Sequence, residues 1–409
     1  MELFKRENYL KRVRGFYHES DIIKVFTGVR RCGKSSLMQI IADELRASGV
    51  EERRILFLNL DKRGYRKIKT ADQLDELIAG FPKGDELSYL FIDEVQNVKD
   101  FEEVLNAYRE DGGYSIFITG SNSYLLSGEL ATKLTGRYIE FEVFPLTFDE
   151  YLQMKAFYGK PTDANLAAEL NRFILGGGFP RAIRFDDLSD MRSYTESVVS
   201  EIFAKDIRRR VKIRNREAFE AVRHFIINNF GAPMSMNSLH EALVKSGLRI
   251  TRQTVTNYID VLLGAKILYE CERFDMKSKR AIKGEKKYYL SDLSFYFCDN
   301  TDNRINYGPV LENLVYFYAR SRGCRVSVGR IGRLECDFIL RDREMDYSYV
   351  QVAYTIAQSR ETEDREYRAL EQIRDNYPKY LMTTDYLLQK RNGIRHVNLM
   401  EFMRNGEEF

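Results

Sequence analysis

The sequence of 409 residues contains few cysteines, no long apolar run and no low-complexity tract. Its longest apolar runs have the length of a strand, which excludes a transmembrane helix of about 20 residues. The five cysteines show no CxxC pairing of the kind that binds metal, so we expect reduced thiols. The charged amino-terminal segment lacks the apolar core of an export signal, which predicts a cytoplasmic protein without a membrane partner. A net charge of only +3 does not by itself indicate a nucleic-acid partner.

The clearest motif lies between an apolar run at Ile22–Thr27 and an amphipathic helix that follows it. Residues 28–35 read GVRRCGKS and fit GxxxxGK[ST], the pattern of a phosphate-binding loop. Gly28 and Gly33 fall where a backbone that wraps around phosphate needs positive φ or has no room for a Cβ. We expect Lys34 to reach the β- and γ-phosphates and the Ser35 hydroxyl to bind Mg²⁺. Further candidate phosphate contacts are Arg30, Arg31 and Ser36. A glycine-rich turn without a ligand is the alternative.

A second motif ends the apolar run Tyr89–Ile92, which is followed by Asp93 and Glu94. A charged pair at the end of a buried strand faces a site or a partner, because placing it in the core would be costly. In P-loop enzymes this position holds an acid associated with Mg²⁺. We assign that role to Asp93, and to Glu94 the role of the base that orients the attacking water. Two solvated acids at the start of a loop are the alternative.

Strand-like runs recur at 55–60, 115–119 and 139–144, with helical patterns between them. This alternation predicts an α/β fold in which helices cover both faces of a parallel sheet. The phosphate loop is followed by an extra strand, then by the strand that ends in two acids, and then by a strand that ends in Thr119-Gly120-Ser121-Asn122. The order of these motifs resembles the AAA+ branch of P-loop ATPases. The resemblance implies that either Ser121 or Asn122 contacts the γ-phosphate or the attacking water, and the residues do not separate the two.

The AAA+ resemblance also implies an arginine finger that one subunit supplies to its neighbour, and hence a homo-oligomer such as a hexameric ring. Arg137 stands in the corresponding place, just before the fifth strand, although it could instead pair with an acid of its own chain. In the helical segment that follows, a glycine triplet precedes Pro180 and Arg181. Arg181 corresponds to a second sensor of nucleotide, with a structural salt bridge as the alternative. The implied cofactors are ATP and Mg²⁺.

Residues 211–295 show three helical patterns and a hairpin, an order that resembles a winged helix-turn-helix. The third expected helix carries Arg252 and Gln253 on the face opposite its apolar stripe. The segment from Lys277 to Lys287 is dense in cations that suit a DNA backbone. These six residues are Lys277, Lys279, Arg280, Lys283, Lys286 and Lys287. The alternative is a solvated hairpin in a winged helix that binds protein.

The last hundred residues resemble the PD-(D/E)XK nuclease fold. The resemblance rests on a helix with Glu312, a strand with Asp337 and a strand with Gln351. In that family the third element is (E/Q)xK, and here the lysine position is occupied by Ala353. With no lysine there and with Gln351 uncharged, little besides Asp337 is left to hold Mg²⁺. We therefore expect a nuclease-like domain that is inactive.

The expected parts are a P-loop core at 1–146, a helical lid at 147–210, a winged helix at 211–295 and the nuclease-like domain at 300–409. This order resembles a widespread prokaryotic group of predicted AAA+ ATPases. It implies a Mg²⁺-dependent oligomeric ATPase that binds duplex or branched DNA and remodels it or moves along it. Two alternatives stay open: a nucleotide-gated signalling or defence switch whose C-terminal domains bind protein, and a metal-dependent nuclease.

Overall fold

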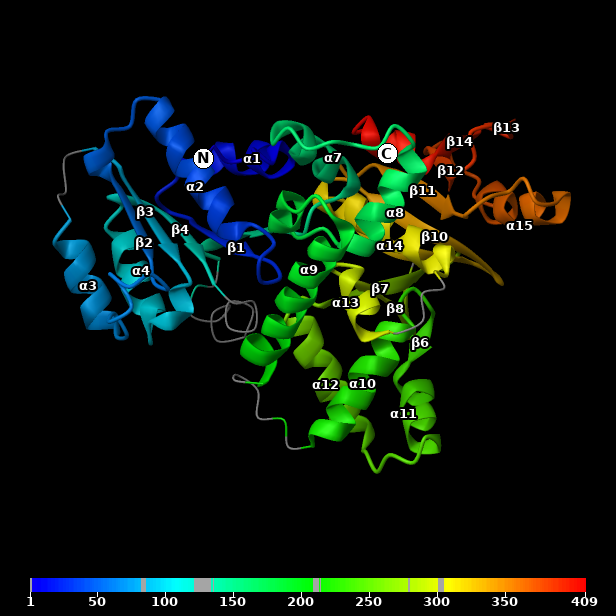
Figure 1. Cartoon of the computed structure of the whole chain (residues 1–409), viewed down its shortest axis with the longest axis horizontal. Helices are drawn as coiled ribbons and strands as arrows, with labels where there is room; N and C mark the ends of the chain where they lie inside the picture. Colours follow the sequence, from blue (N-terminus) through cyan, green and yellow to red (C-terminus); the bar gives the residue numbers. More distant parts are fainter. Residues whose placement is uncertain are drawn as a thin grey trace. The chain divides into compact units, whose positions relative to one another are not determined.

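A computed structural model describes most of the chain (Figure 1). The described residues are 2–81, 86–120, 134, 136–208, 213, 215–278, 280–300 and 305–409, with the backbone alone at 281–283. They form two compact units, residues 1–145 and residues 146–409.

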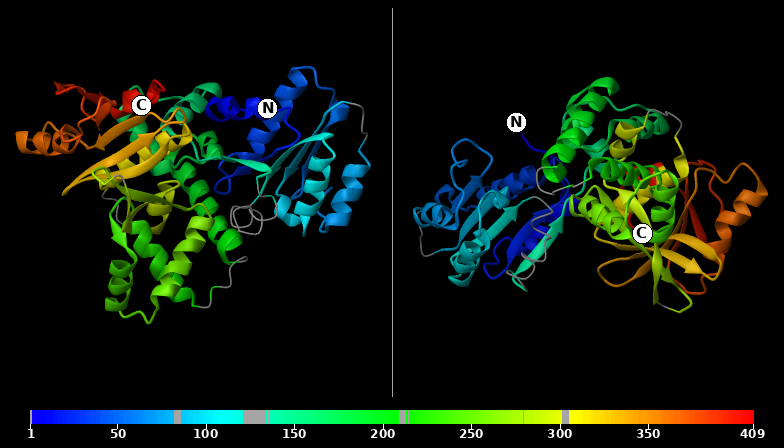
Figure 2. Two further views of the ribbon diagram at one scale, coloured as in Figure 1. Left: turned by 180° about the vertical axis from the view of Figure 1, so that it is seen from behind. Right: turned by 90° about the horizontal axis from the view of Figure 1, so that it is seen from below.

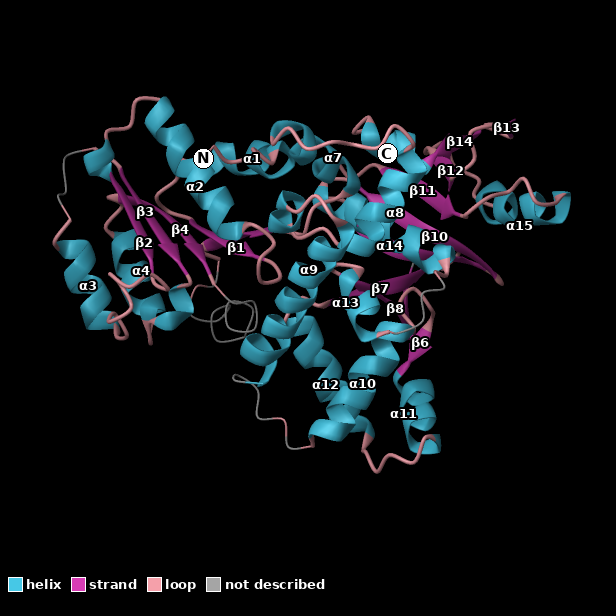
Figure 3. Ribbon diagram, in the orientation of Figure 1, coloured by secondary structure: helices cyan, strands magenta, loops and turns pink. Residues whose placement is uncertain are grey.

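The first unit contains a five-stranded sheet in which all strands are parallel (Figure 3). The strands are β1 (Ile23–Thr27), β2 (Ile55–Asn59), β3 (Ser88–Asp93), β4 (Tyr114–Thr119) and β5 (Tyr138–Glu142), in the order β2-β3-β4-β1-β5. The helices are α1 (Glu7–Val13), α2 (Lys34–Ala47), α3 (Ala71–Ala79) and α4 (Phe101–Glu110). The α/β fold predicted from the alternating pattern is confirmed.

The two faces of this sheet are packed by different residues, because side chains alternate along each strand. One face is aliphatic and packs against α3 and α4 through side chains such as Leu74 and Leu105. The other face carries a stack of phenylalanines, with ring centroids 5.5 Å apart for Phe57 and Phe91 and 4.5 Å apart for Phe91 and Phe117. Tyr17 packs edge-on against Phe117. A sheet buried on both faces holds the carboxyl ends of its strands rigidly at one edge.

The second unit begins with helices and also contains a large sheet (Figure 2). Its helices are α7 (Phe148–Phe157), α8 (Leu166–Gly176), α9 (Leu188–Ile202), α10 (Arg216–Asn228), α11 (Met236–Lys245), α12 (Arg252–Gly264), α13 (Ser294–Asp299), α14 (Tyr307–Ser321), α15 (Arg360–Glu371) and α16 (Leu399–Arg404). Its strands are β6 (Met234–Ser235), β7 (Leu268–Asp275), β8 (Arg280–Leu290), β9 (Arg325–Ile331), β10 (Leu334–Arg341), β11 (Tyr347–Val352), β12 (Lys379–Thr383), β13 (Lys390–Arg391) and β14 (Ile394–Asn398).

One nine-stranded sheet runs through most of this unit, in the order β13-β14-β12-β11-β10-β9-β7-β8-β6. The β7–β8 hairpin belongs to it because β7 pairs in parallel with β9, with Arg273 opposite Val328. The boundary expected between residues 295 and 300 therefore does not separate two sheets. None of the helices in the described ranges is long and apolar enough to cross a membrane.

In the glycine triplet at 176–178, Gly176 ends α8, and the other two glycines precede the short helical turn at Pro180–Arg184. Gly178 donates its N–H to Asp292 Oδ2 over 2.6 Å and accepts from the Leu146 N–H at 2.7 Å. A Cβ on Gly178 would lie 2.6 Å from the Leu146 carbonyl oxygen. The glycine is needed here for close backbone approach, and Asp292 fixes the turn from the end of the hairpin.

Candidate nucleotide site

The phosphate-binding loop joins β1 to α2 and has the backbone geometry that its glycines predict. Gly28 has φ +139° and Gly33, the residue before α2, has φ +109°. A Cβ on Gly28 would overlap the carbonyl oxygen of Val143. Only glycine fits this conformation and this space, and the helix amino terminus behind the loop favours an anion.

The Lys34 ammonium lies against the loop itself. It donates to the carbonyl oxygens of Gly28, over 2.8 Å, and Val29, over 3.1 Å, and the residue is 8% exposed. Arg31 is exposed with φ +68°, and Arg30 is half-buried. Lys34, Arg30 and Arg31 thus lie on one short segment at the amino terminus of α2, and their contact with phosphate stays a prediction.

Asp93 is the centre of a hydrogen-bond network at the carboxyl edge of the sheet. Its Oδ1 accepts from Ser35 Oγ at 2.9 Å and from Thr119 Oγ1 at 2.5 Å, and its Oδ2 accepts from Asn59 Nδ2 at 2.6 Å. Sequence reasoning missed Asn59 and Thr119. A signal for both existed, because each is the last residue of a strand that runs parallel to β3. Parallel strands bring such terminal residues to one edge.

The oxygen atoms of this network suit Mg²⁺, which prefers hydroxyl and carboxylate ligands. Ser35 lies in the first turn of α2, and Asp93 is 1% exposed with both oxygens fixed by neighbours. The directly bonded pair of Ser35 and Asp93 therefore fits the role of Mg²⁺ ligands that the sequence assigned to it.

Glu94 follows in an uncommon backbone conformation, with φ +61°. Its N–H donates to Thr119 Oγ1 at 3.1 Å, and its carboxylate accepts from Gln96 Nε2 at 2.5 Å. Residues other than glycine held at positive φ cost energy and cluster at functional sites. The backbone and Gln96 together fix the direction of the candidate base, a role of Gln96 that no sequence pattern indicated.

Arg6 supports the loop from the amino-terminal segment and was also missed. Its guanidinium donates to the carbonyl oxygens of Cys32, over 3.0 Å, and Phe144, over 2.9 Å, and the residue is 6% exposed. The Cζ atom of Arg6 lies 4.5 Å from the ring centre of Tyr9, and the Tyr9 hydroxyl accepts from the Phe144 N–H at 3.2 Å. Arg6 therefore ties the residue before Gly33 to the segment that follows β5.

Arg137 lies at the opposite edge of the sheet from the loop. Its carbonyl oxygen accepts from the Ile23 N–H at the start of β1, whereas Gly28 follows the end of that strand. Five strand residues at ~3.3 Å each separate the two edges. The Arg137 guanidinium pairs with Glu110 at 2.9 Å and its side chain is 46% exposed. An acid of the same chain thus holds Arg137, which is the alternative that the sequence left open to an arginine finger.

The remaining predicted contacts with nucleotide are Ser121 or Asn122, and Arg181. Ser121 and Asn122 lie outside the described residues. Arg181 is exposed on the helical turn Pro180–Arg184 of the second unit.

The predicted cations of the β7–β8 hairpin do not share one surface. Arg252, Gln253, Lys277 and Arg280 are exposed. Lys286 pairs with Glu270 at 2.5 Å. Lys287 is 3% exposed and lies among carboxylates, so its prediction as a DNA contact is wrong. The reason is the alternation of side chains along β8, which turns Lys287 inward. Lys279 and the side chain of Lys283 lie outside the described part.

The predicted degenerate nuclease residues come close together in the second unit. Gln351 Oε1 accepts from the Asp337 N–H at 3.3 Å, and Glu312 and Asp337 both approach the Lys287 ammonium. Gln351 Nε2 donates to Glu366 Oε2 at 3.0 Å. Sequence reasoning missed Lys287 and Glu335 as members of this group.

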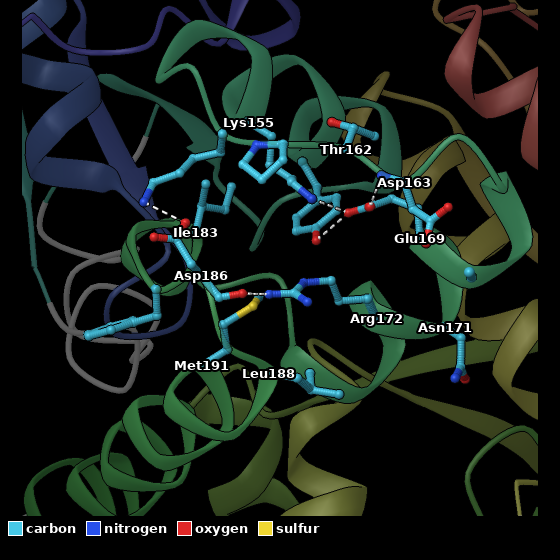
Figure 4. A pocket seen from close by; sticks show the side chains of 15 residues that line it. Lys155, Thr162, Asp163, Glu169, Asn171, Arg172, Ile183, Asp186, Leu188 and Met191 are labelled. Carbon is cyan, nitrogen blue, oxygen red and sulfur yellow. Dashed lines mark hydrogen bonds and ion pairs between the residues drawn. The ribbon is translucent and has the colours of Figure 1, made fainter.

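A pocket among α7, α8 and the turn before α9 contains none of the predicted site residues (Figure 4). Lys155 and the Tyr151 hydroxyl both bind Glu169, and Arg172 donates to the Asp186 carbonyl oxygen. These polar groups bond to one another, so we interpret their role as holding the helices around the pocket together.

The parallel sheet, the phosphate-binding loop and the Asp93 network together define a P-loop ATPase domain of the AAA+ class. Residues 20–152 match the AAA domain family, and residues 167–298 match a domain family of unknown function, DUF8612. The walker-type ATPase PABY2304 of Pyrococcus abyssi is similar in fold, with a TM-score of 0.51 and 17% identity over 73% of this chain and 96% of that one.

Relatives extend over both units. An uncharacterized protein of Haemophilus influenzae is 32% identical over 98% of each chain. The uncharacterized protein MJ1544 of Methanocaldococcus jannaschii is 31% identical over 85% of this chain and 78% of its own. At this identity and coverage, the chain belongs to the same family as these two proteins.

Proposed function

We propose that the protein is a Mg²⁺-dependent ATPase that works as an oligomer and binds DNA, which it remodels or moves along. The observation that carries the ATPase is the hydrogen-bonded set of Ser35, Asp93 and Thr119 beside the phosphate-binding loop. Ser35 and Asp93 would hold Mg²⁺, which when bound neutralises charge on the β- and γ-phosphate oxygens.

The chain's own residues supply the rest of the chemistry. Lys34 exchanges the carbonyl oxygens of Gly28 and Val29 for phosphate oxygens, which are stronger acceptors because they are charged. The N–H groups at the start of α2 face the same anion. Glu94, fixed by Gln96, orients the attacking water and accepts its proton.

The ATPase half is tested by phosphate release from ATP and Mg²⁺ with the full-length protein. Lys34→Ala should abolish hydrolysis because nucleotide loses its main cationic contact. Glu94→Gln should retain nucleotide binding and lose turnover, because an amide cannot accept the proton. Lys99→Ala, an exposed change away from the loop, is the matched control. Hydrolysis by Lys34→Ala at the wild-type rate contradicts the assignment.

The DNA half rests on the arrangement of α10, β6, α11, α12, β7 and β8, which follows the order of a winged helix. Arg252 and Gln253 are exposed in the first turn of α12, and Lys277 and Arg280 are exposed on the hairpin. Because Lys286 and Lys287 are paired with acids, fewer cations face solvent than the sequence count suggests. We therefore expect a modest salt dependence of binding.

Fluorescence anisotropy with labelled duplex and branched DNA tests this half. Arg252→Ala should weaken binding by about 1–3 kcal/mol if it reads a base, and Arg280→Ala should lower the salt dependence if it contacts phosphate. Arg325→Ala, exposed on β9, is the control. If neither DNA binds in a salt-dependent way while ATP is hydrolysed, the protein-binding switch replaces this half of the proposal.

A further inference from the structure

A buried lysine lies among three carboxylates in the second unit. Lys287, on β8, places its Nζ 3.0 Å from Glu312 Oε2, 3.0 Å from Glu335 Oε1 and 3.8 Å from Asp337 Oδ1. Only 4% of its side chain is exposed. The acids come from α14 and β10, so the contact joins the hairpin to two other elements.

The lysine is held in this place by its strand. Side chains alternate along β8, so Lys287 and Tyr289 share one face while Lys286 points to the other. The Tyr289 hydroxyl donates to Glu312 Oε2 at 2.9 Å, and its ring stacks on Tyr316 with centroids 4.5 Å apart. Neighbours on the same face thus fix the position of the ammonium.

Other oxygens of the acids already have partners. Asp337 Oδ2 accepts from the Val352 N–H at 2.8 Å, and Glu335 Oε2 accepts from Arg273 Nη2 at 2.6 Å. The remaining oxygens, Asp337 Oδ1 and Glu335 Oε1, turn toward Lys287, as does Glu312 Oε2. Three carboxylates therefore converge on one cation.

The charges in this cluster depend on one another. Burial and the nearby charge of Glu312 raise the pKa of Asp337 well above its usual range, although Lys287 opposes this effect. Burial alone lowers the pKa of Lys287, but Glu312, Asp337 and Glu335 together raise it above its ordinary value. The ammonium therefore stays charged at neutral pH, and without it the buried acids would repel one another.

We propose that Glu312, Glu335 and Asp337 form a divalent-cation site whose cation position is held in this protein by the ammonium of Lys287. An ammonium offers three N–H donors and so matches three carboxylate acceptors. Mg²⁺ and Mn²⁺ take the same oxygen ligands. The chain carries its own counter-ion at this position, and the carboxylates take up metal only when Lys287 is removed.

Mn²⁺ binding to the full-length chain, followed by electron paramagnetic resonance without nucleotide, tests the proposal. Every protein carries Ser35→Ala, so that the nucleotide site does not contribute. Lys287→Ser should gain one Mn²⁺ per chain, and adding Asp337→Asn should remove it. The wild-type cluster should bind none. Lys286→Ser, whose side chain faces the other side of β8, is the matched control and should also gain none.

The thermal stability of the same proteins gives a second measurement. Lys287→Ser should melt at a lower temperature than its parent and regain stability in Mn²⁺, while Lys287→Ser/Asp337→Asn should not respond to Mn²⁺. Binding of Mn²⁺ by the chain with Lys287 intact, lost on Asp337→Asn, overturns the proposal. A folded Lys287→Ser that binds no Mn²⁺ also overturns it. If Lys287→Ser does not fold without metal, it is refolded in the presence of Mn²⁺. Failure of the variant to regain its fold in Mn²⁺ counts against the proposal.

Discussion

At the scale of single residues, Arg6 shows how a side chain outside the motif controls the loop. It supplies donors to the buried carbonyl groups of Cys32 and Phe144. Leaving a buried acceptor without its donor costs about 1–3 kcal/mol, which corresponds to roughly 5- to 150-fold in an equilibrium constant. We expect Arg6→Ala to raise the KM for ATP within this range and to change kcat less, as measured by steady-state hydrolysis.

The conservative variant separates this positioning role from a general loss of stability. Arg6→Lys keeps one donor and should recover part of the lost affinity. Arg14→Ala, which removes an exposed pair with Glu7 and Glu44, serves as the control and should leave the KM unchanged. A KM equal to that of the wild type in Arg6→Ala, at temperatures where it is folded, would show that Cys32 holds its position without Arg6.

The residues that sequence reasoning found and missed differ in a physical way. Lys34 and Ser35 belong to a loop whose geometry is set by adjacent residues, so their spacing alone predicts the site. Asn59 and Thr119 reach Asp93 only because β2 and β4 flank β3. Strand order is a long-range property that local patterns do not encode, although polar residues at strand ends narrow the search.

At the scale of elements, Glu44 joins the amino-terminal segment to α2. Its carboxylate accepts from Arg14, from Lys5 and from the Tyr17 hydroxyl. The hydrogen bond from Arg14, opposed by burial and aided by Lys5 and Tyr17, lowers the pKa of Glu44 to about 2. Because this value lies below that of the unfolded chain, the contribution of Glu44 to stability is complete above about pH 5. It is lost as the pH falls toward 2.

This dependence predicts the behaviour of Glu44→Gln. The variant should be less stable than the wild type at pH 7, and the difference should shrink between pH 5 and pH 2, because a protonated Glu44 has already lost its ion pairs. Chemical unfolding of both proteins between pH 7 and pH 2 measures the difference in their free energies of unfolding. Glu52→Gln is a control with a more exposed carboxylate. A constant difference between wild type and Glu44→Gln at all pH values would assign the effect to lost packing instead.

The β7–β8 hairpin shows where composition misleads at this scale. Counting cations from Lys277 to Lys287 treats the segment as one surface, but a strand shows alternate residues to opposite faces. Lys286 therefore meets Glu270 while Lys287 meets Glu312. Glu270 lies on the neighbouring strand β7, whereas Glu312 lies on the distant helix α14, so the sequence of the hairpin alone does not show that Lys287 is covered.

At the scale of the whole molecule, the position of Arg137 limits how it can act in the proposed oligomer. It lies at the amino edge of its own sheet and cannot reach the loop at the carboxyl edge, so any catalytic role requires a neighbour. Its exposed pair with Glu110 is worth about 0–1 kcal/mol and is readily exchanged for a phosphate oxygen. Arg137→Ala should lower kcat by about 10³-fold or more with little change in nucleotide affinity.

Mixing two inactive variants tests whether Arg137 acts across a subunit boundary. The Lys34→Ala chain keeps Arg137, and the Arg137→Ala chain keeps an intact loop, so a mixed oligomer contains interfaces where both are present. We expect the mixture to regain ATP hydrolysis that neither variant shows alone. Glu110→Gln, which removes the ion pairs of Glu110 with Arg137 and Arg109, should stay active. Size analysis shows whether mixed oligomers form. If they form and remain inactive at every ratio, Arg137 does not serve a neighbouring site, because interfaces with both an intact loop and an Arg137 would then be present without hydrolysing ATP.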